Sequence, residues 1–444
     1  MANAIGADIT AGRLQPGEQL PPQRELAYQL GISVGTVTRA YAEARRRGLV
    51  DGQVGSGTYV RRFDAPETGF VLPPDAPGAM IDLSISVFAS PVWDQPLREA
   101  LADLATTDNA ALMEYQGAAG IMRHREAGAT WLRRTGYTPQ PDEVMLTMGG
   151  QHAMAVAISA LSRPGDTMLV ENFCYPPVRA LATMFGITLK GVEMDPEGIT
   201  PVAFDAACRM SDTSLIYLTP TLQNPTNGIM GNDRRAEIAA IARRHDVRII
   251  EDEVTGALLT ELPLPIAHWA PERVCLISSV SKAVAPGLRT GFLAAPLPLH
   301  DSLSERIRAF SWMATPLTAE IAARWIEDGT AWRMRDAISR ENTARHALVA
   351  EILDGVDEPS PAAVSPHLWH RLPERWGSSG FVEAAQALGV RIAGTQAFSV
   401  GQRGAGDHIR ISVSAARNRE EFRRALEILA EIGRGTPARD LNIL

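Results

Sequence analysis

The feature that most constrains the fold is an alternation, from residue 130 onward, of helical hydrophobic patterns with short apolar runs rich in β-branched residues. Strands that are separated by helices form mainly parallel, twisted sheets, so the sequence predicts an α/β fold. In such sheets, ligands bind beyond the carboxyl ends of the strands. The strand candidates are residues 168–170, 215–218, 248–251 and 274–277.

The stretch after the last of these runs centres on Lys282, which is conspicuous because only two of the 43 Lys and Arg residues are lysines. An amine can form an imine with an aldehyde, whereas a guanidinium cannot. The hydroxyls of Ser279 and Ser281 and the guanidinium of Arg289 stand close by in the sequence, and these groups suit a phosphate. The stretch therefore predicts a site for pyridoxal 5′-phosphate (PLP). The alternative is a strand that ends in a solvated lysine.

Two more stretches carry polar or aromatic groups at the points where strands are expected to end. Gly149, Gly150 and Gln151 precede a helical run at 152–161. Glycines let a phosphate approach the backbone, and a helix N-terminus supplies free N–H groups and positive potential. Tyr175 follows a strand and is suited to stack on a flat ring. The alternatives are an ordinary Gly pair before a helix and a tyrosine of the core or its rim.

Two further side chains follow the strands at 215–218 and 248–251. Asn224, fixed by the following proline, offers an amide donor for a phenolate oxygen; the alternative is a plain Asx-Pro turn. Asp252 stands at a strand end, where a carboxylate can pair with a protonated pyridine nitrogen. Its alternative is a strand-end cap.

In combination, the order Gly-Gly-Gln, aromatic, Asn-Pro-Thr, Glu-Asp and Ser-x-Ser-Lys-x(6)-Arg resembles fold-type I PLP enzymes of the aspartate aminotransferase class. The resemblance covers about residues 81–444. It implies that Lys282 forms the imine and that Asp252 pairs with the pyridine nitrogen. It also implies that Asn224 holds the ring oxygen and that Tyr175 stacks on the ring. The remaining motif residues, by the same resemblance, contact the cofactor, chiefly its phosphate: Gly149, Gly150, Gln151, Ser279, Ser281 and Arg289.

The same resemblance extends to two residues outside these motifs. Arg410 matches the arginine that binds the α-carboxylate of an amino acid through a bidentate pair of hydrogen bonds. Tyr115 matches a tyrosine that binds the cofactor phosphate in the neighbouring subunit. A homodimer with shared sites is therefore expected. Relatives usually carry a tyrosine beside the ring oxygen, two or three residues after the Asp, where this chain has Val254 and Thr255. Because Thr255 cannot reach as far as a phenol, PLP binding is expected more firmly than efficient transamination.

The first 62 residues differ in charge from the rest of the chain. They hold eight Arg and five acidic residues, a net charge of +3, whereas the remainder carries −11. Helical patterns at 21–31 and 34–47 are joined by a tight turn, and short strands are expected at 49–50 and 58–60. A basic head of this kind predicts a helix-turn-helix with a two-stranded wing that binds a polyanion.

The stretch from Leu14 to Val60 closely resembles the GntR-type winged helix-turn-helix. Four polar residues fall near the start of its second helix, where a recognition helix meets base edges and phosphates. The alternative is a basic three-helix cap with a solvated face. The expected DNA contacts are Arg24, Ser33, Thr36, Thr38, Arg39 and Gly57.

The sequence predicts three segments: the DNA-binding head at 1–62, a proline-rich linker at 63–80 and the PLP-binding body at 81–444. Within the body, a large part is expected at about 110–320, and a small part from about 81–109 and 321–444. No apolar run approaches membrane-spanning length, there is no signal-peptide pattern, and the three cysteines form no CxxC pair. No membrane partner and no metal are expected, and the cytoplasm is the expected location.

A GntR-type head fused to an aminotransferase-like body resembles the MocR subfamily of bacterial transcription regulators. The resemblance implies a homodimer that binds double-stranded DNA at promoter half-sites. Its body would sense PLP, or an amino acid or amine effector, through an imine at Lys282. The alternative, from a different class, is a working PLP-dependent aminotransferase with an appended regulatory head.

Overall fold

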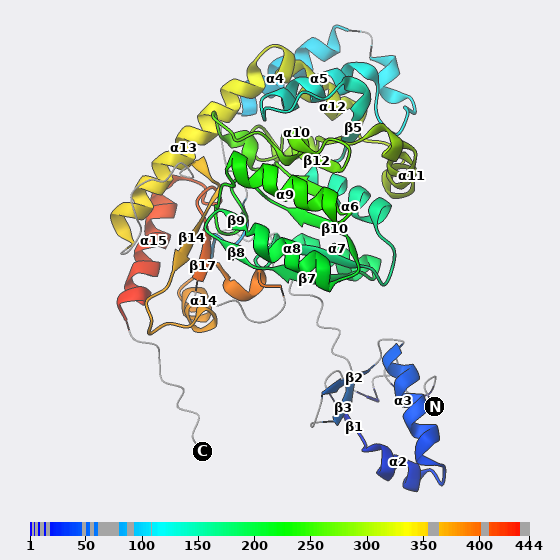
Figure 1. Cartoon of the computed structure of the whole chain (residues 1–444). Coiled ribbons are helices and arrows are strands. Elements are labelled where there is room, and N and C mark those ends of the chain that lie inside the picture. The colour runs from blue at the N-terminus through cyan, green and yellow to red at the C-terminus, as the bar shows by residue number, and fades with distance from the viewer. Residues whose placement is uncertain are drawn as a thin grey trace. The chain divides into compact units, whose positions relative to one another are not determined.

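The structure is a computed structural model of the 444-residue chain (Figure 1). It divides into two compact units, Met1–Glu67 and Thr68–Leu444, and each is described by itself. The residues described are 18–46, 50–53, 57–60, 80–86, 93–107, 109–353, 364–400 and 408–435, with five positions before residue 18. Apart from Met80, the linker predicted over 63–80 lies outside these ranges.

The first unit packs two helices, α2 (Gln23–Gln29) and α3 (Val34–Arg46), with a small antiparallel sheet. The sheet has three strands in the order β1 (Gln19–Leu20), β3 (Gly57–Val60), β2 (Val50–Gln53). This arrangement agrees with the helix-turn-helix and wing that the sequence predicts.

The sequence predicted two strands in the head, whereas the sheet has three, the additional one being β1. Gln19 and Leu20 pair with Tyr59 and Thr58 on the outer side of β3, and a run of two residues is too short to show a strand pattern in the sequence. Leu20 then reaches the core of the head, where it is buried with the inward face of α3. That face consists of Val37, Tyr41 and Ala44, at helical spacing.

The second unit is built on a seven-stranded sheet in the order β5-β13-β12-β11-β10-β6-β7. Every pairing is parallel except the two made by β13, so the sheet is mainly parallel, as predicted. The four predicted strands correspond to the four neighbours β12, β11, β10 and β6. The strands are β5 (Val144–Thr147), β6 (Thr167–Glu171), β7 (Thr188–Val192), β10 (Thr213–Leu218), β11 (Arg248–Asp252), β12 (Val274–Ser279) and β13 (Gly291–Ala294).

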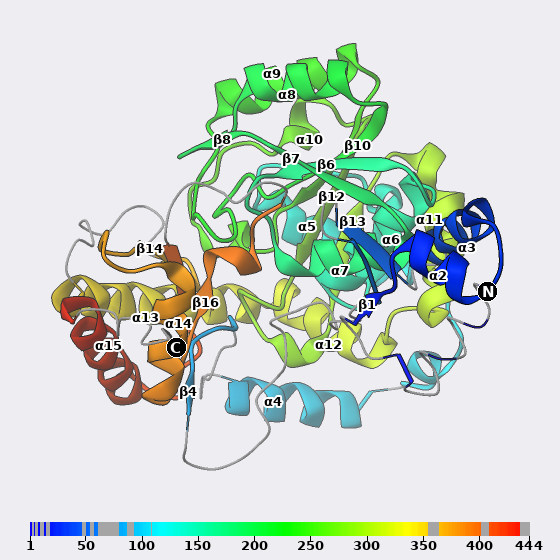
Figure 2. The same cartoon turned by 90° about the horizontal axis from the view of Figure 1, so that it is seen from below.

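Helices cover both faces of this sheet. One face carries α6 (Gly150–Leu161), α7 (Pro176–Phe185) and α11 (His300–Ser311). The other face carries α5 (Met122–Arg133), α8 (Pro201–Met210), α9 (Asn232–Arg244), α10 (Ile266–Trp269) and α12 (Pro316–Glu327). Figure 2 shows the strands between α8 and α9 on one side and α6 and α7 on the other.

The strands feed two separate hydrophobic cores because successive side chains point to opposite faces. In β10, Leu215 and Tyr217 pack on the α6 face, whereas Ile216 and Leu218 pack on the α9 face. Both faces are buried, as expected for strands joined by helical crossovers. The polar positions are therefore pushed to the strand ends, where the candidate site lies.

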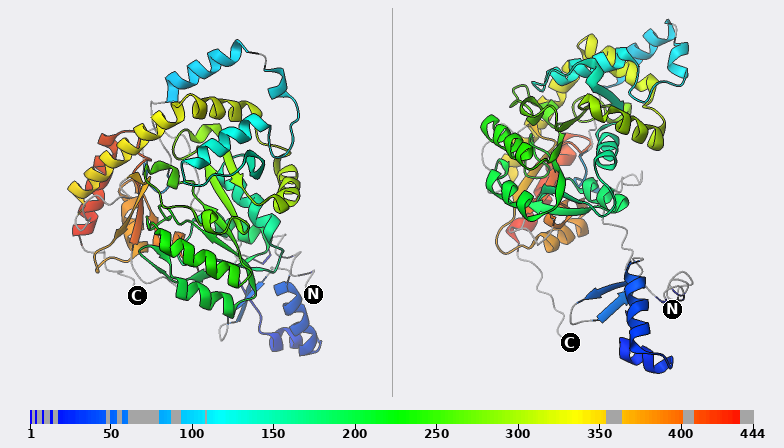
Figure 3. Two further views of the ribbon diagram at one scale, coloured as in Figure 1. Left: turned by 45° about the horizontal axis from the view of Figure 1, so that its top comes forward. Right: turned by 45° about the vertical axis from the view of Figure 1, so that its right-hand side comes forward.

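A smaller layer forms from the end of the chain together with residues 80–86. One sheet has the order β14 (His367–Arg371), β17 (His408–Ser412), β16 (Ala393–Gly394), and β4 (Ile81–Asp82) pairs in parallel with β15 (Val390–Arg391). The helices of this layer are α13 (Thr330–Ile352), α14 (Ser378–Ala387) and α15 (Arg419–Arg434). Helix α13 contacts both α12 and α15 and so joins the two layers (Figure 3).

The second unit also contains a further helix and a short hairpin. Helix α4 (Asp94–Ala105) buries Ala100 and Leu104 in the core of the large sheet, and β8 (Met194–Asp195) pairs with β9 (Gly198–Ile199) as a hairpin. None of the helices in the described part of the chain is long and apolar enough to cross a membrane.

Candidate functional site

The predicted site residues of the second unit come from segments that follow the large sheet's strands. Gly149 follows β5, Asn224 follows β10, Asp252 ends β11, and Lys282 follows β12. Carboxyl ends of parallel strands meet at one edge of a sheet, which is where α/β folds bind ligands. Hydrogen bonds and electrostatic interactions described below connect most of these residues, although they lie far apart in the sequence.

Lys282 lies just beyond β12, and its amine is half-buried. Its Nζ donates a hydrogen bond to the backbone carbonyl of Ser86 at 2.5 Å. Burial, together with the nearby charges of Arg410 and Arg289, lowers the pKa of the Lys282 amine to about 8, while the charge of Asp252 acts the other way. A sizeable fraction of this amine is neutral near pH 7 to 8, which is the form that attacks an aldehyde.

Asp252 is the last residue of β11 and is buried. One carboxylate oxygen accepts a hydrogen bond from the Tyr217 hydroxyl at 2.8 Å, and the other accepts one from the Val254 N–H at 3.0 Å. Burial raises the pKa of Asp252 to about 6, and these hydrogen bonds act against that rise. Asp252 is therefore mostly ionised at pH 7 and can pair with a protonated ring nitrogen.

A second cluster surrounds the N-terminus of α6. Gly149 stands just before the helix with φ of 84°, a conformation that favours glycine, and a Cβ there would lie 2.9 Å from Nη2 of Arg289. A Cβ on Gly150 would lie 2.7 Å from a methyl group of Val254. Arg289 Nη2 donates to the Met148 carbonyl at 3.1 Å. The backbone here leaves a cradle beside a guanidinium, as a phosphate requires.

The other predicted phosphate residues lie around this cradle. The hydroxyls of Ser279 and Ser281 are 2.9 Å apart and buried, and the backbone N–H of Ser281 donates to the Ser279 hydroxyl at 3.1 Å. Gln151 is exposed in the first turn of α6. Arg289, with φ of 47°, is also exposed, so its guanidinium is accessible to an anion.

Arg410 comes from β17 and reaches the same site from the smaller layer. Its Nη1 donates to Oδ1 of Asn224 at 2.9 Å, and its Nη2 donates to the carbonyl of Ser84. The guanidinium lies over the Phe398 ring, 4.7 Å from its centroid. Burial lowers the pKa of Arg410 to about 10, so the group stays charged at neutral pH.

Tyr175 and Thr255, which the sequence placed beside the cofactor ring, have different surroundings. Tyr175 precedes α7 and is half-buried, and burial raises the pKa of its hydroxyl to about 12. The Thr255 hydroxyl lies 3.2 Å from the carbonyl of Thr221 and 3.3 Å from that of Leu222. Thr255 therefore supports the loop before Asn224, and its hydroxyl does not supply the missing phenol.

Tyr115, another predicted cofactor residue, faces solvent. Its side chain is 83% exposed, and its ring packs edge-on against Trp312 with the centroids 5.7 Å apart. Trp312 is itself exposed, as is Met113 two residues before the tyrosine. Such a cluster of exposed apolar side chains is typical of a protein–protein interface.

In the first unit, the predicted DNA contacts gather at the start of α3. Ser33 caps this helix, because its hydroxyl accepts a hydrogen bond from the Thr36 N–H at 3.2 Å. Thr38 donates to Gln23 of α2 at 2.7 Å, which fixes the two helices to each other. The remaining predicted contacts are Arg24, exposed on α2, Arg39, exposed on α3, and Gly57, the first residue of β3.

Sequence reasoning missed Tyr217, Ser84 and Ser86. Tyr217 sits in an apolar strand run, where it looks like an ordinary core residue. The two serines act through backbone carbonyls, which any residue carries, so no residue type could reveal them. For Tyr217 the available signal was the strand alternation, which puts a polar hydroxyl on a buried face.

The residues present suit PLP by the chemistry of the donor set. They combine an amine with a lowered pKa, a buried carboxylate and a glycine cradle next to an arginine. In addition, Nε of Arg410 and the Ser86 hydroxyl are buried without a hydrogen-bond partner among the residues described. Buried polar atoms are rarely left unpaired, so these atoms fit a site that binds a polar ligand.

Two family models match different parts of the chain. The family described as "Aminotransferase class I and II" matches residues 79–429, and the family described as "Bacterial regulatory proteins, gntR family" matches residues 1–60. Both matches confirm the predicted pairing of a GntR-type head with an aminotransferase-like body.

Among curated relatives, the uncharacterized HTH-type transcriptional regulator YdeF of Bacillus subtilis is 29% identical over 97% of this chain and 93% of its own length. YjiR of Escherichia coli, also an uncharacterized HTH-type regulator, is 31% identical over 74% of this chain and 75% of its own. The HTH-type pyridoxine biosynthesis transcriptional regulator PdxR of Corynebacterium glutamicum is 26% identical over 78% of this chain and 76% of its own.

Solved structures resemble the body. An archaeal alanine:glyoxylate aminotransferase superposes with a TM-score of 0.72 at 21% identity, covering 80% of this chain and 91% of the other. A multiple substrate aminotransferase from Thermococcus profundus gives 0.72 at 21% identity, covering 84% and 98%. At this identity the likeness establishes the fold alone, which confirms the predicted fold-type I body.

Proposed function

Because the chain belongs to the class I and II aminotransferase family and joins that body to a GntR-family head, the architecture of the MocR subfamily, we propose that it is a transcription regulator. The head binds double-stranded DNA at promoter half-sites, and the body binds PLP at Lys282. PLP itself, or an amino acid or amine that reacts with it, is the signal. A protein that binds the chromosome works in the cytoplasm, which is the location we propose.

The observation that carries this proposal is the convergence of Lys282, Asp252 and Arg410 in a body that is fused to a helix-turn-helix. When bound, PLP supplies an aldehyde and an electron-withdrawing pyridine ring. Lys282 would provide the amine for the aldehyde, and Asp252 would hold a proton on the ring nitrogen. Gly149 and Arg289 suit the phosphate, and Arg410 suits the carboxylate of an amino acid.

We propose that the regulator is a homodimer, supported by the exposed side chains of Tyr115, Trp312 and Met113. A second copy of this chain that covered this cluster would bury apolar surface and bring Tyr115 to the partner's phosphate site. Two heads in one dimer would then bind two half-sites, as paired helix-turn-helix units do.

The second candidate function is a working aminotransferase. The presence of Arg410, whose buried Nε has no hydrogen-bond partner in the part of the chain that the structure describes, favours it. The environment of Thr255 argues against efficient turnover, because its hydroxyl is engaged with the carbonyls of Thr221 and Leu222. Because residues 254 and 255 are Val and Thr, neither position supplies a phenol that could tune the reactivity of the Lys282 amine.

Two measurements test these functions. Binding of the purified protein to duplex DNA from beside its own gene, with and without PLP, tests the regulator; no binding in either condition contradicts it. Addition of candidate amino acids and a keto acid to the PLP-loaded protein tests the enzyme; rapid catalytic formation of pyridoxamine phosphate would favour the second function.

Borohydride reduction of the PLP-loaded protein tests the attachment site. Because the chain has only two lysines, Lys190 and Lys282, mass spectrometry can assign the reduced adduct without ambiguity. The adduct is expected on Lys282, and Lys282→Ala should lose both the adduct and the absorbance while keeping basal DNA binding. If no reduced adduct is found on Lys282, the proposed attachment site is wrong.

A further inference from the structure

Residues 80–86 are the first described residues of the second unit, and they run directly from the linker into the ligand site. We call them the connecting segment. Its first half is fixed in the smaller layer by backbone hydrogen bonds: Ile81 N–H donates to Gly389 at 2.8 Å and Leu83 N–H donates to Arg391 at 2.7 Å. The Ser412 N–H donates to the Leu83 carbonyl at 2.8 Å.

The second half of the connecting segment is held by the two cationic side chains of the ligand site. Arg410 donates to the Ser84 carbonyl, and Lys282 donates to the Ser86 carbonyl at 2.5 Å. Two of the hydrogen bonds to the segment's backbone therefore depend on residues that a ligand would also use, whereas the Ser84 N–H donates to Asp82 within the segment at 2.8 Å. The Ser86 hydroxyl is buried beside them without a partner in the described part of the chain.

The bond to Ser86 depends on the chemical state of Lys282. When the amine joins an aldehyde, its nitrogen forms a double bond to the aldehyde carbon, and its two hydrogens leave with the aldehyde oxygen as water. The imine nitrogen keeps at most one hydrogen, which is fixed in the plane of the double bond, so it no longer has the freely rotating N–H groups with which the amine donates to Ser86. If an incoming amine takes the place of Lys282 on the aldehyde carbon, the lysine regains its hydrogens and can donate again.

We propose that the connecting segment reports the state of the ligand site to the linker: a free Lys282 amine holds the segment through Ser86, and joining of that amine to the cofactor releases it. This proposal rests on the proposed binding of PLP at Lys282. It concerns the regulation of that site, because only three residues lie between Ser84 and Met80, where the predicted linker ends.

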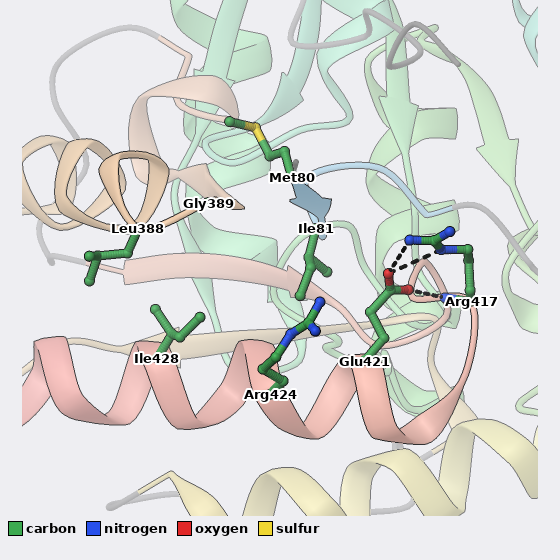
Figure 4. Close-up of a pocket in the computed structure, with 8 residues that line it drawn as sticks. All are labelled: Met80, Ile81, Leu388, Gly389, Arg417, Glu421, Arg424 and Ile428. Atoms are coloured by element: carbon green, nitrogen blue, oxygen red, sulfur yellow. Dashed lines mark hydrogen bonds and ion pairs between the residues drawn. The ribbon is translucent and has the colours of Figure 1, made fainter. Parts of the chain in front are cut away.

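The other end of the connecting segment has room to respond. Met80 and Ile81 border a groove of about 290 Å³ against α15, whose Ile428, Arg424 and Glu421 line the far side (Figure 4). Met80 is 41% exposed, so its displacement would not open the core. Loss of the bond at Ser86 removes one of the restraints on the segment, and the groove beside Met80 leaves room for its first residue to shift.

Hydrogen exchange over residues 80–86 in the full-length protein, with and without PLP, tests the proposal. PLP should speed exchange of this peptide by about tenfold, the size expected when a hydrogen bond from a charged donor is lost. In cofactor-free Lys282→Ala the exchange should already be fast, and PLP should not change it. Lys190→Ala is the matched control, because Lys190 donates to the Ser211 hydroxyl, outside the site, and its exchange should follow the wild type.

The absorbance of bound PLP is recorded on the same samples, so two failures can be told apart. If PLP does not join Lys282, the proposed function itself is wrong. If PLP joins Lys282 and exchange over 80–86 stays unchanged, the connecting segment does not report the site and the inference is overturned. The wild-type comparison decides this alone, even if Lys282→Ala does not fold.

Discussion

The hydrogen bond from Tyr217 to Asp252 leads to the sharpest prediction about the cofactor site. The hydroxyl donates to the carboxylate at 2.8 Å in a fully buried setting, so it stabilises the ionised form of Asp252. Tyr217→Phe removes this donor, together with the interaction of the hydroxyl with Thr219, and keeps the ring. The pKa of Asp252, about 6 in the wild type because of burial, should therefore rise further in the variant.

The size of the effect follows from the charge on the acceptor. A hydrogen bond to a charged group contributes about 1.5 to 3 kcal/mol, which corresponds to a rise in pKa of about 1 to 2. The pKa of Asp252 in the variant should then lie at about 7 to 8. At pH 7 the ionised fraction of the carboxyl should fall from about nine-tenths to between about one-half and one-tenth.

PLP titrations followed by absorbance at several pH values measure this shift. The variant should bind PLP about 2 to 10 times more weakly at pH 7, and the two proteins should converge near pH 9, where both carboxylates are ionised. At each pH the PLP affinity of the wild type is divided by that of the variant. Lys282 titrates in both proteins, so its effect on PLP binding cancels in this ratio. The other ionisable groups that interact with Asp252, namely Glu253, Glu171 and Tyr175, are also unchanged.

A ratio that does not change between pH 6 and pH 9 would refute the reasoning. It would mean that Tyr217 affects PLP only through packing, since a packing defect does not depend on the ionisation of Asp252. A ratio that grows as the pH falls would show that Tyr217 positions and ionises the carboxylate.

Three further predictions concern other parts of the chain. Burial raises the pKa of Glu171 to about 8 from an ordinary 4.5, so this group lowers the stability of the folded protein progressively as the pH rises between those values. Glu171→Gln removes this ionisation. The Tm of the variant minus the Tm of the wild type should therefore increase from pH 5 to pH 8. Gly149→Ala should weaken PLP binding about tenfold, because φ is positive and the added Cβ lies 2.9 Å from Arg289, whereas Gly433→Ala, with nothing within 4 Å, should not; equal affinities would contradict the cradle. Arg39→Ala should lower the salt dependence of DNA binding by about one counterion, and an unchanged slope would exclude that contact.

The central strands of the body could be predicted because each is an apolar, β-branched run bounded by polar residues. The three strands of the large sheet that were missed lack this pattern for physical reasons. β7 carries Lys190 and Gly191 and is only partly buried, β13 begins with Gly291 beside the backbone of Gly149, and the centre of β5 is Met145 and Leu146, which are not β-branched. The third strand of the head is shorter still.

The candidate site was partly predictable for a similar reason. Side chains such as Lys282 and Asp252 have special chemistry and follow recognisable strands, so residue type and position together point to them. The supporting contacts cannot be found in this way. Tyr217 matters only because β10 lies beside β11, and Thr255 turns away from the ring site only because the loop at 221–222 offers it two carbonyls.

The contacts of the connecting segment show why this kind of information needs the folded chain. Ser84 and Arg410 are 326 residues apart in sequence, and Ser86 and Lys282 are 196 apart, yet each pair is hydrogen-bonded. Both bonds tie the residues nearest the head to the residues that would bind the signal. A ligand that used Lys282 and Arg410 would have to compete with these two bonds. The proposed coupling between ligand and DNA would therefore need no relay through the sheet, since Ser84 and Ser86, which follow the predicted linker in the sequence, contact Arg410 and Lys282 directly.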